Sequence, residues 1–97
     1  MALDVVGYSS LMGRDETGTL DRLKRLRREL VQPSIDEYHG RTVKLMGDGL
    51  LAEFSSVVDA LQCAVQIQEG IAIREQNVAD EDRIALRVGV NLGDIIV

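Results

Sequence analysis

The chain has 97 residues, of which 45% are hydrophobic and 3% aromatic, and its formal net charge is −5 at pH 7. This length allows one small domain, and the hydrophobic content argues against disorder. The acidic balance disfavours non-specific contact with nucleic acid or an anionic membrane. The single cysteine, Cys63, excludes an intrachain disulfide, and no run is apolar and long enough to suggest a membrane span. We therefore expect a cytoplasmic protein that has no nucleic-acid partner and no membrane contact through this segment.

Residues 1–6 predict a short strand that ends at Gly7, and Asp4 interrupts its apolar run. An acidic side chain in a central strand is costly unless it is paired or binds a cation. The following segment, residues 7–10, predicts a turn that leads toward a helix. Small residues in such a turn let backbone N–H groups approach an anion such as phosphate.

Residues 15–40 predict helical structure, because leucines recur at helical spacing from Leu20 to Leu30. Basic residues between positions 22 and 28 form the other face. We expect that face to be solvated, and contact with an anionic partner is the less favoured alternative. Pro33 removes one helical hydrogen bond, so it predicts a kink or a break between two helical segments. Gly40 suits the helix end.

Residues 41–54 predict a β-hairpin, because two apolar arms flank Gly47-Asp48-Gly49. Asp-Gly is a strong hairpin signal, since glycine accepts a positive φ without steric cost. The turn therefore places the Asp48 carboxylate at the hairpin tip. Asp48 alone could be a simple turn former. Lys44 is a charged residue within the first arm, where it could donate a hydrogen bond to a nucleobase or extend its amine to solvent.

Residues from Ser55 or Ser56 to about Gln76 predict a second long helix, and residues 84–90 predict another strand. Residues 91–94 predict a turn, and residues 95–97 the start of a further strand. The expected apolar stripe of the second helix comprises Val57, Leu61, Ala64, Ile67 and Ile71. This order of elements predicts an α+β fold, a ferredoxin-like or palm-type sandwich that is incomplete at both ends, with a largely antiparallel sheet and helices packed on one face.

Asp4 and Asp48 would lie at one edge of this sheet if their strands are neighbours. Two carboxylates at strand ends are a natural site for one or two Mg²⁺ ions, which prefer oxygen ligands and retain waters or substrate phosphates. Two ions about 4 Å apart would bind a phosphoryl group between them. The turn that contains Gly7, Tyr8 and Ser9 follows Asp4 directly, where a triphosphate could lie.

Three blocks of the sequence resemble the class III adenylate/guanylate cyclase catalytic domain, in particular that of bacterial adenylate cyclases. They are Asp4-Val-Val-Gly-Tyr-Ser9, Val43-Lys-Leu-Met-Gly-Asp-Gly-Leu-Leu51 with Phe54, and Arg87-Val-Gly-Val-Asn-Leu-Gly-Asp94. The blocks occur in the family's order and at suitable distances. The resemblance spans nearly the whole chain and corresponds to roughly the N-terminal half of a family domain, so residues 1–97 are expected to form a partial cyclase domain.

The resemblance implies roles for individual residues. Asp4 and Asp48 match the two catalytic, metal-binding aspartates, and the carbonyl of Val5 matches a further metal ligand for two Mg²⁺ or Mn²⁺ ions. Residues 7–9 match the phosphate-binding turn. Lys44 matches the position at which lysine favours adenine. The family converts ATP to 3′,5′-cyclic AMP and pyrophosphate at a site formed between two cyclase domains, which implies a homodimer or a second cyclase domain as partner.

The resemblance implies an adenylate cyclase, but the family's asparagine and arginine that stabilise the transition state have no counterpart before Val97. Because loss of such a donor costs about 100- to 1000-fold, we expect turnover by the isolated chain to be strongly reduced. The alternative hypothesis is a non-catalytic cyclase fold that serves as a dimerisation or interaction module. It follows from the unpaired edges that an incomplete sheet would expose.

Overall fold

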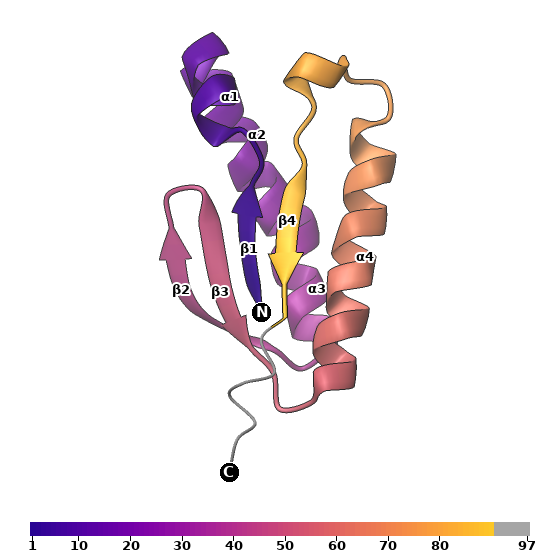
Figure 1. The fold of residues 1–97 in the computed structure, drawn as a ribbon. Helices are drawn as coiled ribbons and strands as arrows, with labels where there is room; N and C mark the ends of the chain where they lie inside the picture. The colour runs from indigo at the N-terminus through magenta and orange to yellow at the C-terminus, as the bar shows by residue number, and fades with distance from the viewer. Residues whose placement is uncertain (91–97) are drawn as a thin grey trace.

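The computed structural model describes residues 1–90, and its strands form one antiparallel sheet. The strand order across the sheet is β2-β3-β1-β4 (Figure 1). The strands span β1 Ala2–Val5, β2 Arg41–Met46, β3 Gly49–Glu53 and β4 Leu86–Gly89. The expected hairpin is thus present as β2 and β3, and the expected first strand lies at the centre of the sheet, between the hairpin and β4.

The helices lie on one face of the sheet (Figure 1). They are α1 Tyr8–Arg14, α2 Glu16–Leu26, a π-helical segment η1 Arg27–Val31, α3 Gln32–Glu37, α4 Val57–Glu75 and a short 3-10 turn η2 Asp80–Asp82. The local chemistry explains two helix starts. The Asp15 carboxylate accepts a hydrogen bond from the Gly18 N–H at 3.0 Å, and Ser56 Oγ accepts one from the Asp59 N–H at 3.3 Å.

The core lies between the helices and the inward face of the sheet. Leu3 and Val5 of β1 are buried and alternate with more accessible neighbours, and Leu50 and Ala52 of β3 do the same. They pack in one cluster with buried residues of the helices, namely Leu11, Leu26, Val31, Ile35, Cys63, Ile67 and Ile71. Cys63 is a fully buried apolar residue, as expected, and burial raises the pKa of its thiol to about 11.

Pro33 does not break the helix. The segments α2, η1 and α3 follow one another without a gap, and Leu26 and Gln32 at their junctions have right-handed helical φ and ψ. The Gln32 N–H bonds the carbonyl of Arg27, five residues earlier. This wider turn lies directly before Pro33, where the proline ring would otherwise clash with the preceding helical turn. Of the expected kink or break, the break is therefore not found, and a π-helical turn lies before the proline instead.

The apolar stripe of α4 agrees with the expected one at Ile67 and Ile71, but differs from it in the N-terminal half of the helix. Its buried residues are Ala60, Cys63, Ile67 and Ile71, whereas Leu61 is 50% exposed. Ala60 and Cys63, which are small, take the buried positions in that half of the helix. The larger Leu61 side chain falls on the outer face with Val58 and Val65.

The arginine-rich face of α2 is only partly solvated. Lys24, Arg25 and Arg28 are exposed as expected, but Arg22 is half-buried. Its guanidinium donates to Glu75 Oε1 at 2.7 Å and to the Asp82 carbonyl at 2.9 Å. The same Glu75 oxygen accepts from the Ile84 N–H at 2.8 Å, so α2 and α4 together hold the segment that leads into β4.

The expected fold class is confirmed: the fold is α+β, with an antiparallel sheet and its helices on one face. Within residues 1–90, no helix combines the length and apolar character that crossing a bilayer requires. The turn and strand expected in residues 91–97 lie outside the described residues.

Candidate metal and nucleotide site

The pairing of β1 with β3 brings Asp4 and Asp48 to the same end of the sheet. Asp4 lies opposite Gly49, the residue after Asp48, and the Val5 N–H donates to the Asp48 carbonyl at 2.9 Å. The two aspartates are 44 positions apart in the sequence, and the sheet makes them neighbours. The hairpin turn is thereby attached to the end of the central strand by its own backbone.

Gly49 is required for this close approach. A Cβ at position 49 would lie 2.5 Å from the carbonyl oxygen of Leu3, a distance that β-carbons do not adopt. Any side chain there would push β3 away from β1 and carry the Asp48 turn with it. The glycine that predicts the hairpin from sequence therefore also fixes the separation of the two aspartates.

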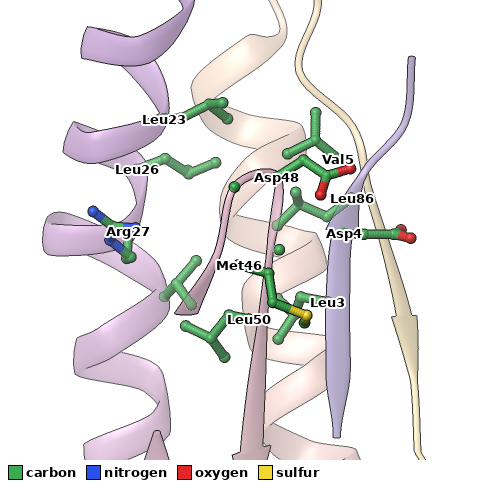
Figure 2. A pocket seen from close by; sticks show the side chains of 13 residues that line it. Leu3, Asp4, Val5, Leu23, Leu26, Arg27, Met46, Asp48, Leu50 and Leu86 are labelled. Atoms are coloured by element: carbon green, nitrogen blue, oxygen red, sulfur yellow. The ribbon is translucent and has the colours of Figure 1, made fainter. Parts of the chain in front are cut away.

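A small cavity of about 60 Å³ lies beneath this turn, between the sheet and α2–η1. Its walls are mostly apolar, and Asp4, Asp48 and Arg27 are its charged residues. Figure 2 shows the Asp48 side chain directed toward β1. It also shows the Asp4 carboxylate projecting away from the cavity, on the side of β1 remote from α2. Asp4 is thus a rim residue with its charged group on the uncovered face of the sheet.

The guanidinium of Arg87 on β4 forms a bidentate contact with the Asp4 carboxylate. Nε donates to Oδ1 at 3.0 Å and Nη2 to Oδ2 at 3.3 Å. The pair is partly solvated, because the side chains are 71% and 45% exposed. Sequence reasoning assigned no role to Arg87. The signal that could have found it is the alternation of β4, which places Arg87 between the inward Leu86 and Val88 and on the same face as Asp4.

Lys44 lies on β2, an edge strand whose residues are mostly exposed. It does not line the cavity below Asp48. Strand register places it opposite Leu51, which in turn lies opposite Ala2. Lys44 therefore lies on the same face of the sheet as Asp4, in the adjacent row of side chains. The strand β3 lies between β2 and β1, so these two strands are about 10 Å apart. A β-bulge between Thr42 and Lys44 interrupts the regular pairing next to it.

The turn after β1 consists of Val6 and Gly7, and Tyr8 and Ser9 already belong to the first turn of α1. Gly7 has φ +64°, a left-handed conformation that favours glycine, and α1 starts at Tyr8. No side chain caps this helix start. Exposed Ser9 and half-buried Tyr8 follow Asp4 by only a few residues. The turn expected over residues 7–10 is therefore shorter than predicted, because residues 8–10 are helical, and it lies just beyond the aspartate.

The donor set at this end of the sheet fits a hard divalent cation that keeps other ligands. The side-chain oxygens come from Asp4 and Asp48, and the Val5 carbonyl lies on the same strand end. Within residues 1–90, no three His, Cys, Asp or Glu side chains form a group that could hold a metal ion. Two carboxylates with waters and substrate phosphates are the usual Mg²⁺ environment, whereas a structural Zn²⁺ or Ca²⁺ site needs more protein ligands.

Comparisons with known proteins give consistent matches, although no protein-family model matches the chain. The crystal structure of an "Adenylate/Guanylate Cyclase/Hydrolase" from Silicibacter pomeroyi superposes with a TM-score of 0.85 and 46% identity. The match covers 93% of this chain and 52% of that one. The protein named "Putative adenylate cyclase 3" of Rhizobium meliloti (strain 1021) is 44% identical over all 97 residues. "Serine/threonine-protein kinase pkn2" of Myxococcus xanthus is 27% identical over 96 residues.

The chain spans about half the length of the solved relative, and 16% and 12% of the two curated proteins. The fold and the neighbouring aspartates define an α+β domain with two carboxylate residues at one end of an antiparallel sheet. The 46% identity to the solved cyclase and the three sequence blocks narrow this class to one family. The chain is part of a class III nucleotide cyclase domain.

Proposed function

We propose that the chain forms the metal- and nucleotide-binding part of an adenylate cyclase domain that converts ATP to 3′,5′-cyclic AMP and pyrophosphate in the cytoplasm. The observation that carries the proposal is the β1–β3 pairing, which brings Asp4 and Asp48 together with the Val5 N–H bonded to the Asp48 carbonyl. Sequence alone leaves Asp48 open to interpretation as a turn former. A second carboxylate at the same strand end supports the ligand role.

In this proposal, Asp4, Asp48 and the Val5 carbonyl hold Mg²⁺ or Mn²⁺. A bound divalent cation would supply the positive charge that the triphosphate and an attacking ribose hydroxyl require. The N–H groups of residues 7–9 would contact the phosphates. Lys44 would donate to an acceptor atom of adenine, and its place on the open face, two strands from Asp4, supports that role.

The test is ATP binding to the 97-residue chain in the presence and absence of Mn²⁺, measured by calorimetry. We expect Mn²⁺-dependent binding that weakens at least tenfold in Asp4→Asn and in Asp48→Asn, since loss of a ligand costs at least as much as loss of an outer-shell partner. Glu53→Gln is the matched control, because Glu53 is a carboxylate on the far end of β3 that pairs with Arg41. Unchanged metal-dependent binding in both aspartate variants would refute the proposal.

The base preference has its own test. Lys44→Glu should shift binding from ATP toward GTP, because a carboxylate accepts from guanine where an ammonium donates to adenine. Lys24→Glu, an exposed lysine of α2, is the control for the charge change alone. If the ratio of ATP to GTP affinity stays the same in both variants, Lys44 does not select the base.

A second candidate function, a dimerisation or interaction module, is favoured by the uncovered sheet face and its edge. Val43, Leu45, Met46 and Leu51 are 39–53% exposed on the hairpin, where a second cyclase domain could cover them. Sedimentation of the chain tests this idea directly. A folded monomer at high concentration would count against association, whether or not the chain binds ATP.

A further inference from the structure

The open face of the sheet carries one row of side chains that crosses all four strands at Asp4. Strand register defines this row, which runs from Met46 of β2 through Gly49 of β3 and Asp4 of β1 to Arg87 of β4. Gly49 has no side chain and Met46 has no charge. Arg87 is therefore the only charged neighbour of Asp4 within this row of described residues.

Arg87 fixes the direction in which Asp4 points. Both carboxylate oxygens accept hydrogen bonds from the guanidinium, one from Nε and one from Nη2. This bidentate geometry is more directional than a contact between point charges. The carboxylate lies on the side of β1 away from the cavity, whereas the Asp48 side chain is directed from the turn toward β1 (Figure 2). A cation shared by both aspartates needs the Asp4 carboxylate to leave this orientation.

The segment that carries Arg87 is itself held in place. Four residues of β4 pair with β1, and the Ile84 N–H donates to Glu75, which Arg22 also binds. Arg87 is thus presented to Asp4 by a fixed strand, and the arginine need not move for the pair to form. Release of Asp4 requires only side-chain rotation.

We propose that Arg87 is a resident counter-cation of Asp4 that a divalent ion must displace, so that Arg87 sets the metal affinity of the site. This inference rests on the proposed metal role of Asp4 and Asp48. Partly solvated ion pairs contribute modestly, so the effect is a tuning of affinity: removing the arginine charge should tighten metal binding by about three- to tenfold.

The experiment measures binding of Mn²⁺ alone to the 97-residue chain, by the loss of the free-ion electron paramagnetic resonance signal at fixed ionic strength. Arg87→Gln should bind Mn²⁺ more tightly than the parent chain. The Mn²⁺ affinity of Arg87→Lys should lie between those of the parent chain and Arg87→Gln, because lysine keeps the charge but cannot form the bidentate contact. Arg83→Gln is the matched control, since Arg83 pairs with Asp80 outside the site and its loss should leave the affinity unchanged.

Ionic strength gives a second readout. The difference between Arg87→Gln and the parent chain should shrink as salt is raised, because exposed charges are screened. Circular dichroism melts confirm that each variant is folded, which the 71% exposure of Arg87 favours.

The outcomes separate the two proposals. Equal or weaker Mn²⁺ binding in Arg87→Gln, with binding lost in Asp4→Asn, overturns the role of Arg87 and leaves the proposed metal site intact. Mn²⁺ binding that is unchanged in both Asp4→Asn and Asp48→Asn overturns the metal site and the inference together. Tighter binding in Arg83→Gln as well would show a general charge effect and would also overturn the specific role.

Discussion

The two faces of the sheet carry different kinds of side chain, although they belong to the same four strands. On the helix-covered face, Leu3 and Leu50 are each 4% exposed. On the open face, the same strands present Asp4, which pairs with Arg87, and Leu51, which is 39% exposed. The covered face therefore contributes stability, and the open face carries Asp4, Arg87 and Lys44 of the candidate site, whereas Asp48 lies in the hairpin turn at the end of the sheet. Successive side chains of a strand point to opposite faces, so a residue of the core and a residue of the open face can be direct neighbours in the sequence.

The largest effect should come from the covered face. Ile67→Ala on α4 removes a side chain with no exposed surface, and we expect a loss of about 2–5 kcal/mol in the free energy of unfolding. Ile73→Ala is the matched control on the same helix, since Ile73 is 67% exposed and should change stability by less than about 0.5 kcal/mol. Urea unfolding measures both. Similar losses in the two variants would mean that α4 packs by another face.

The next prediction concerns two ion pairs, one on each side of the sheet. Glu75→Ala leaves Arg22 and the Ile84 N–H without their shared acceptor, so we expect a loss of about 1–3 kcal/mol. Asp4→Asn breaks the Arg87 pair on the open face, where a partly solvated pair contributes at most about 1 kcal/mol. Thermal melts compare the two. An equal or larger loss in Asp4→Asn would contradict the division of tasks between the faces.

A smaller effect concerns alkaline pH and the covered face. Burial raises the pKa of the Cys63 thiol from an ordinary value of 9.0 to about 11. The unfolded chain therefore releases this proton first, so stability is full below pH 9.0 and falls as pH rises toward 11. Unfolding in urea across this range should show a shallower decline in Cys63→Ala than in the parent chain. Parallel declines would show that other groups cause the alkaline loss.

The smallest effect is expected at Leu51 on the open face. Leu51→Thr keeps a strand-favouring side chain, so its free energy of unfolding should stay within about 0.5 kcal/mol of the parent value. Leu50→Thr, one position away, places a hydroxyl in the core and should cost much more. Paired denaturation curves test this one-residue contrast, and a reversed order would show that β3 has the opposite orientation.

The sequence was sufficient for the fold class, for the strands within residues 1–90 and for the long helices, but it did not predict α1, whose first residues were expected to form a turn. The Asp-Gly turn predicted the hairpin, and alternation and helical spacing predicted the strands and the long helices. Sequence could not show that Pro33 follows a π-helical turn, because that depends on how α2 packs on the sheet. It also did not distinguish Ala60 from Leu61 as the inward residue of α4, since small residues gain from close packing only once a partner surface exists.

The candidate site was predictable only in part. Asp4 stood out because a carboxylate is unusual within a central strand, whereas Asp48 is an ordinary turn residue that became a candidate only together with Asp4; the structure makes the two neighbours. Their metal role, the phosphate role of residues 7–9 and the base role of Lys44 stay predictions. The pairing of Arg87 with Asp4 spans 83 positions, and β4 register alone establishes it. One arginine among many on the chain gives no such signal by itself.

The π-helical segment Arg27–Val31 has a consequence for how this chain could change length. Leu26 and Val31 are both buried, although five residues separate them. In a regular α-helix, five residues turn about 140° beyond a full rotation, whereas four turn only about 40° beyond it. Deleting one residue between them would allow an ordinary α-helix to keep both side chains on the core. Inserting one would rotate every later residue off it, so this stretch should tolerate shortening in related sequences and resist lengthening.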